Sequence, residues 1–212
     1  MNLSLGMNSW RLVSFLAIAI GIYPLVFFLP GQVPPFLQSK SDEVWDIAWQ
    51  VGFYLHITGG GIALLSGWSQ FWGKIRSKKL KIHRRLGAIY WVAILFAGAP
   101  GGIFISLNAI GGVPSTMGFG LLGVFWFAST LRALMLIKNG RVQEHRRWMV
   151  RSFALTFAAV TLRLYLPLFT GVFGLEFEQA YIAISWLCWV PNLLIGELII
   201  YNQAKKIRHG LL

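Results

Sequence analysis

Six long apolar stretches are the feature that most constrains how this 212-residue chain can fold. A helix needs about 20 mostly apolar residues to cross a hydrocarbon core of roughly 30 Å. The stretches cover residues 12–29, 47–72, 86–107, 117–137, 153–173 and 181–201. Too little chain lies between them to form a soluble domain. The sequence therefore predicts an all-α integral membrane helical bundle of about six transmembrane helices, as a single domain over residues 1–212.

The composition supports this class and excludes an ordinary water-soluble fold. Hydrophobic residues make up 56% of the chain and charged residues only 12%, with a mean hydropathy of +0.63. These values are far from those of soluble domains. The single cysteine, Cys188, excludes an internal disulfide framework and any paired-cysteine metal or redox motif.

The net charge of +12 is explained by where the basic residues lie. They cluster between the second and third stretches, between the fourth and fifth, and after the sixth: Lys74, Arg76, Lys78, Lys79, Lys81, Arg84 and Arg85; Lys138, Arg141, Arg146, Arg147 and Arg151; Lys205, Lys206 and Arg208. Acidic residues occupy the alternate connections, at Asp42, Glu43, Asp46, Glu176 and Glu178. Because basic loops stay on the cytoplasmic side, we expect both termini to be cytoplasmic. Anionic lipids at that face are the expected partners, and nucleic acid is not.

The third stretch contains Gly98-Ala99-Pro100-Gly101-Gly102 in its outer part. Proline removes a backbone donor, so we expect a kink or break in this helix. Irregular backbone survives in a bilayer only where protein or a wet cavity surrounds it. This end of the third stretch is therefore expected to face the interior of the bundle.

Two of the stretches carry a stripe of small or polar residues at helical spacing. One runs through His56, Gly60, Ala63, Gly67 and Gln70, and the other through Ser152, Thr156, Ala159, Arg163 and Thr170. Close helix packing explains the small residues. It does not explain the two ionisable ones.

His56 and Arg163 are predicted to lie near the membrane midplane. His56 is about 15 Å along a helix from Asp46, and Arg163 is about 18 Å along a helix from Arg151. Ionisable side chains at such depth mark a partner, a cavity or a pathway. One interpretation is a structural ion pair between Arg163 and Glu197. The other is a cofactor: a haem propionate, a quinone carbonyl or a lipid phosphate would suit the guanidinium. His56 would then be an axial haem ligand, a magnesium ligand to a chlorin or a proton-relay group, the alternative being a simple hydrogen bond across helices.

A second candidate site lies at the cytoplasmic rim. His-Arg-Arg occurs at His83 and again at His145, each time before an apolar stretch. If the two helices are adjacent, the histidines can share a haem or metal ion while Arg84, Arg85, Arg146 and Arg147 neutralise propionates or bind anionic lipids. The alternative is that both histidines belong to solvated basic loops.

Several segments resemble a bacterial membrane protein family, domain of unknown function 2306. They are His56–Gly60, Gln70-Phe71, His83–Tyr90, His145–Ser152, Ala154–Thr156 and Thr161–Tyr165. The resemblance covers about residues 50 to 170. It implies a multi-pass protein of the bacterial cytoplasmic (inner) membrane with a signature of histidines and arginines, and it implies no activity.

Two functions of different classes remain open. The first is a redox or cofactor-binding membrane protein that uses His56 and Arg163, or His83 and His145, with haem b as the leading cofactor candidate. The second is a non-catalytic accessory subunit of a larger bioenergetic or photosynthetic complex, whose surface, with 10 Trp and 16 Phe in the chain, contacts partner subunits. We assign no catalytic residue, the identity of any metal is unknown, and enzymatic activity is left undecided.

Overall fold

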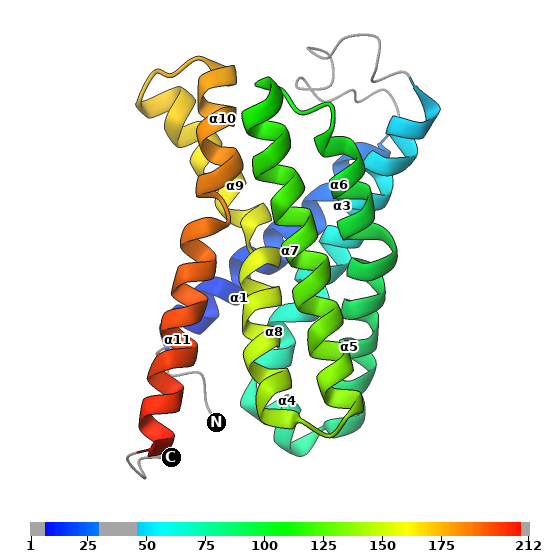
Figure 1. Ribbon diagram of the computed structural model, residues 1–212, viewed down its shortest axis with the longest axis vertical. Coiled ribbons are helices and arrows are strands. Elements are labelled where there is room, and N and C mark those ends of the chain that lie inside the picture. The colour runs from blue at the N-terminus through cyan, green and yellow to red at the C-terminus, as the bar shows by residue number, and fades with distance from the viewer. Residues whose placement is uncertain (1–6, 30–45, 209–212) are drawn as a thin grey trace.

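A computed structural model describes residues 7–29 and 46–208, and every regular element within these residues is helical (Figure 1). In chain order the elements are α1 (Met7–Ile22), η1 (Tyr23–Phe28), α3 (Ile47–Gly67), η3 (Trp68–Phe71), α4 (Gly73–Lys78), α5 (Leu80–Ala93), η4 (Ile94–Gly98), α6 (Ala99–Ser106), α7 (Gly112–Lys138), α8 (Val142–Thr156), α9 (Ala158–Pro167), η5 (Leu168–Val172), α10 (Phe177–Leu187) and α11 (Val190–Arg208). The all-α prediction is confirmed.

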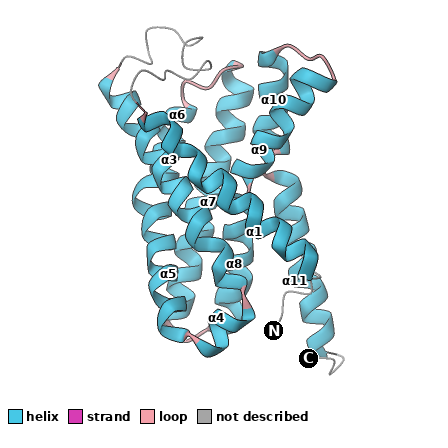
Figure 2. Cartoon of the chain, turned by 180° about the vertical axis from the view of Figure 1, so that it is seen from behind, coloured by secondary structure: helices cyan, strands magenta, loops and turns pink. Residues whose placement is uncertain are grey.

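Within the described residues, five helical segments are long and apolar enough to cross a membrane. They are Ser9–Phe28, Leu80–Ser106, Gly112–Lys138, Val142–Val172 and Phe177–Lys206. Successive segments run in alternating directions, and α1 crosses one side of the bundle obliquely (Figures 1 and 2). The chain is therefore a multi-pass helical membrane protein.

Helix α3 corresponds to the remaining predicted span. Its 21 residues reach about 31 Å at 1.5 Å per residue, the thickness of a hydrocarbon core. Gln50, His56 and several glycines lower its mean hydropathy below that of the five segments named above. It packs against α1, α5 and α6, so protein rather than lipid covers much of its surface. A helix enclosed in this way needs less apolar surface than one that faces lipid, and we retain the prediction that α3 spans the membrane.

The helices begin earlier than the hydropathy pattern predicts. Helix α5 begins at Leu80 and α8 at Val142, so the basic residues expected in connecting loops form the first turns of helices. Lys and Arg are good helix formers, and their long side chains extend away from the apolar core. Hydropathy locates the hydrocarbon core but not the helix ends.

The expected irregularity before Pro100 is present. Residues Ile94–Gly98 form a π-helical turn, in which the N–H of Ala99 bonds to the carbonyl of Ile94. Pro100 then occupies the first turn of α6, where its missing N–H costs least. The wider turn lets the helix continue past the proline.

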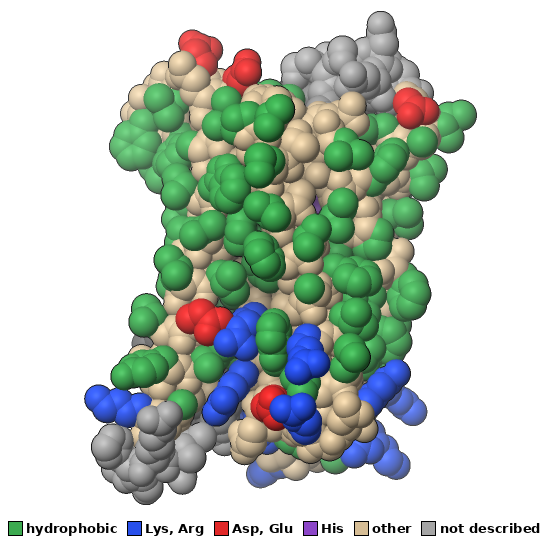
Figure 3. Space-filling view, viewed as in Figure 1, with side chains coloured by type: hydrophobic (Ala, Val, Ile, Leu, Met, Phe, Trp, Pro, Cys, Tyr) green, Lys and Arg blue, Asp and Glu red, His purple; other side chains and the backbone are tan. Residues whose placement is uncertain are grey.

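The basic side chains gather toward one end of the bundle, where Glu144 and Glu197 pair with arginines among them (Figure 3). The basic end contains α4 and the connection from α7 to α8, while Asp46, Glu176 and Glu178 lie at the opposite end (Figure 1). Asp42 and Glu43 lie outside the described residues. The separation agrees with the expected loop pattern, and the assignment of the basic end to the cytoplasm stays a prediction of the positive-inside rule.

A buried hydrogen-bond network holds α5, α7 and α8 together. The hydroxyl of Tyr90 lies 2.8 Å from both Ser152 Oγ and Thr156 Oγ1. Trp126 Nε1 donates to Thr156 Oγ1 at 2.8 Å, and Thr130 Oγ1 lies 2.7 Å from Ser152 Oγ. All five side chains are buried. Ser152 and Thr156, the first two residues of the polar stripe predicted on the fifth stretch, therefore face other helices and bond to hydroxyl and indole groups on them.

We expect Tyr90→Phe to lower the stability of the bundle by about 1 kcal/mol, because it removes the hydroxyl that links α5 to Ser152 and Thr156 on α8. Tyr201→Phe is the matched control, since Tyr201 is 66% exposed. Thermal unfolding in detergent measures both. Equal stability of the two variants would contradict the assigned role of the network.

Candidate functional site

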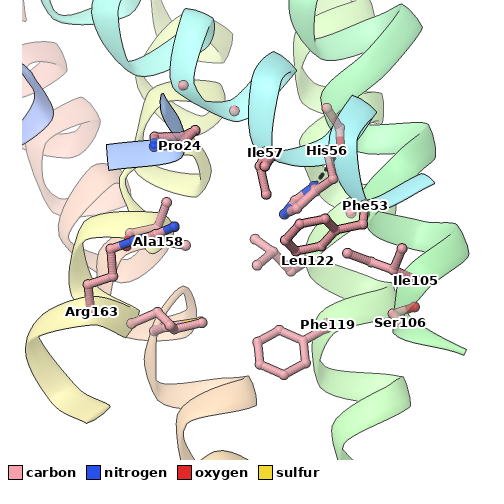
Figure 4. Close-up of a pocket in the computed structure, with 18 of the residues that line it drawn as sticks. Pro24, Phe53, His56, Ile57, Ile105, Ser106, Phe119, Leu122, Ala158 and Arg163 are labelled. Atoms are coloured by element: carbon pink, nitrogen blue, oxygen red, sulfur yellow. Dashed lines mark hydrogen bonds between the residues drawn. The ribbon is translucent and has the colours of Figure 1, made fainter. Parts of the chain in front are cut away.

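A cavity of about 300 Å³ lies inside the bundle between α3, α6 and α7 on one side and α9 and α10 on the other, with η1 along one edge (Figure 4). Most of its lining is apolar, including Phe53, Ile105, Phe119 and Leu122. His56 and Arg163 are both among the lining residues. The two side chains singled out from the sequence therefore face one space.

His56 is held by the irregular part of the third stretch. Its Nδ1 lies 2.7 Å from the carbonyl oxygen of Gly98, the last residue of the π-helical turn. Gly102 lies so close that a Cβ at that position would be 2.7 Å from Nδ1. Glycine at position 102 is therefore required for the imidazole to fit against α6.

The hydrogen bond to Gly98 determines which nitrogen of His56 carries the proton. A carbonyl oxygen only accepts, so Nδ1 donates, and in the neutral imidazole Nε2 carries the free lone pair. Figure 4 shows the other end of the ring projecting into the cavity. His56 thus presents a hydrogen-bond acceptor to whatever occupies this space.

Arg163 lies across the cavity from His56 on α9 (Figure 4). Its Nη1 donates to the carbonyl of Ala159 at 2.9 Å, and its guanidinium carbon lies 4.9 Å from the centre of the Tyr23 ring. Neither ion pair found among the described residues involves Arg163. The guanidinium is therefore held by a carbonyl and an aromatic face, with further N–H groups left to donate.

The expected pair between Arg163 and Glu197 is not formed. Glu197 instead accepts from Arg151, with Nε to Oε1 at 2.5 Å and Nη2 to Oε2 at 2.9 Å. The ring of Trp148 lies 4.6 Å from the same guanidinium. Arg151 lies about 18 Å from Arg163 along the chain's helical path, too far for Glu197 to serve both. The sequence identified the acid correctly but assigned it to the wrong arginine.

The rim residues divide into inward and outward groups. His145 Nδ1 lies 2.8 Å from the carbonyl of Ala133, and His83 Nδ1 is buried with no hydrogen-bond partner among the side chains and backbone that the structure describes. The two histidines are close enough for their charges to interact. Arg146 is half-buried, whereas three of the expected contacts, Arg84, Arg85 and Arg147, are exposed.

Arg76 is a rim residue that the sequence reasoning did not single out. It is half-buried on α4, and repulsion from Arg146 adds to burial in lowering its pKa. No cluster of three or more potential metal-ligating residues occurs in the part of the chain that the structure describes. The rim thus brings basic groups together around His83 and His145, and a cofactor shared by the two histidines stays a prediction.

Aromatic residues of the cavity also escaped the sequence analysis. Tyr23, Trp126 and Tyr181 line the space, and Trp126 lies edge-on to His56 with ring centres 6.5 Å apart. In an apolar span, an aromatic residue that faces a cavity cannot be distinguished from one that faces lipid. No pattern in the sequence could have identified these residues.

The fold and the cavity define a multi-pass α-helical membrane protein with a ligand-sized space inside its bundle. The chain belongs to the family described as predicted membrane protein DUF2306, whose model matches residues 53–200. That range contains both His56 and Arg163. No curated protein and no solved structure shows a significant match to the chain. The family resemblance expected from the sequence is confirmed. Because the family's description names no activity, a function has to be inferred from the residues that line the cavity.

We expect Arg163→Met to leave thermal stability unchanged or to raise it, because it removes a half-buried cation that has no carboxylate partner among the described residues. Arg151→Met should instead lower stability by up to about 1 kcal/mol, since Glu197 loses its partner at a partly exposed site. Unfolding temperatures in detergent provide the comparison. A large loss of stability in Arg163→Met would show that the guanidinium is a structural tie.

Proposed function

We propose that this protein binds a lipid-soluble ligand of the quinone class, with the ligand's ring in the cavity between His56 and Arg163. The observation that carries the proposal is the pair itself: a guanidinium with no carboxylate partner in the described part of the chain, and an imidazole acceptor, on opposite walls of one apolar space. A ring that bears an oxygen on each of two opposite sides can contact both groups.

The energetics of Arg163 support a ligand. Placing arginine at the centre of a membrane helix costs about 2.5–3.5 kcal/mol even by insertion scales. The contact with the Tyr23 ring offsets about 0.5–2 kcal/mol of that cost, and the carbonyl of Ala159 satisfies one donor. Ionisable side chains whose burial lowers the stability of the fold are found mainly at functional sites, because they are kept for binding a ligand rather than for stability. A ligand oxygen would use the donors that the protein leaves open.

The size of the cavity distinguishes among the candidate ligands. About 300 Å³ is at the lower end of the range for small-molecule pockets. A single substituted ring fits this volume, whereas a haem macrocycle requires more space. Among the described residues that line the cavity, His56 is the only histidine, so a two-histidine haem is not supported there either. We therefore favour a quinone over haem b at this site.

The position of the cavity suits a ligand dissolved in the bilayer. The wall formed by η1 has Pro24 buried toward the interior, while Leu25 is 64% exposed on the outer surface. The cavity would hold the ring, and an isoprenoid tail would lie along the apolar outer surface of the helices.

The proposal predicts saturable binding of decylubiquinone to the protein in nanodiscs. Trp49 and Trp126 line the cavity, so quenching of tryptophan fluorescence reports occupancy. Arg163→Met should weaken binding about tenfold or more, because a hydrogen bond to a charged donor contributes about 1.5–3 kcal/mol.

Arg151→Met is the matched control for this measurement. It removes the same type of side chain from outside the cavity and should retain wild-type affinity for the quinone. The proposal fails if the wild-type protein binds neither the quinone nor its reduced quinol form, or if Arg163→Met and Arg151→Met bind the ligand equally well.

A further inference from the structure

The two walls of the cavity have opposite hydrogen-bonding character. His56 is committed to donating from Nδ1 to Gly98, which leaves Nε2 as an acceptor. Arg163 has only donors. A ligand that satisfies both must therefore present an O–H or N–H to His56 and an oxygen lone pair to Arg163.

The oxidised and reduced forms of a quinone differ in this property. A quinone carries two carbonyl oxygens, both acceptors, so one would meet Arg163 while the other would face the lone pair of Nε2. A quinol carries hydroxyl groups, so one can donate to Nε2 while the oxygen of the other accepts from Arg163. Buried groups left unpaired are costly, and an acceptor that faces an acceptor remains unpaired.

We propose that the cavity selects the reduced, hydroxyl-bearing form of its ligand over the oxidised form, and that His56 is the residue that makes the selection. This inference rests on the proposed function, because it concerns the redox form of the ligand rather than whether one binds. Arg163 contributes affinity for both forms. Only the contact with His56 distinguishes them.

The surroundings of His56 keep its orientation and its neutral form. Gly102 packs against the imidazole, and Trp126 lies edge-on to it at 6.5 Å. A ring flip would break the 2.7 Å bond to Gly98 and place a carbon against that carbonyl. An imidazolium would be a second cation facing Arg163 across an apolar space, which the membrane interior disfavours. The acceptor character of Nε2 is therefore built into the fold.

The test compares decylubiquinol with decylubiquinone on the full chain in nanodiscs under anaerobic conditions. We expect the wild-type protein to bind the quinol about tenfold more tightly. In His56→Gln the ratio of the two affinities should fall to about twofold or less, because the glutamine amide offers either a donor or an acceptor. His145→Gln, which changes a histidine at the rim, should keep the wild-type ratio.

Each outcome separates this inference from the proposed function. If the wild-type protein binds neither form, the proposed function itself fails. If it binds both equally, or the quinone more tightly, the selection is overturned while ligand binding stands. If the ratio falls equally in His56→Gln and His145→Gln, His56 is not the selecting residue. The wild-type ratio decides the central point even if a variant does not fold.

Discussion

The π-helical turn before Pro100 is the constraint on which the rest of the site depends. Proline prevents an ordinary helical turn at this point, and the chain responds by widening Ile94–Gly98 rather than by breaking. The carbonyl of Gly98 then accepts from His56, while glycine at position 102 makes room for the imidazole. The π-helical turn thus fixes the orientation of His56 inside the bundle.

Two arginines on the same stretch of chain, Arg151 and Arg163, differ in whether they have an acidic partner. Arg151 near the basic end has Glu197 as a partner and requires no ligand. Arg163, much deeper, contacts a carbonyl and the face of Tyr23, and forms no ion pair within residues 7–29 and 46–208. The same side chain is therefore structural in one place and open to a ligand in the other. What differs is whether a carboxylate is within reach.

Much of this arrangement could be predicted from the sequence, because it depends on periodicity along single helices. The apolar stretches, the irregularity at Pro100 and the small or polar stripe that begins at Ser152 and Thr156 are properties of one segment each. The partner of Glu197 could not be predicted, because it depends on which level of α8 meets α11. Tyr23 and Trp126 were missed for a related reason, since the cavity forms only where separate helices come together.

The most direct test of the account is to extract the protein purified in detergent from its native membrane and to identify small molecules by mass spectrometry. The account predicts a quinone-class molecule at about one per chain in the wild-type protein. It predicts loss of that molecule from Arg163→Met and its retention in Arg151→Met. A wild-type protein free of such a molecule, or equal amounts in both variants, would contradict the assignment of the cavity as a binding site.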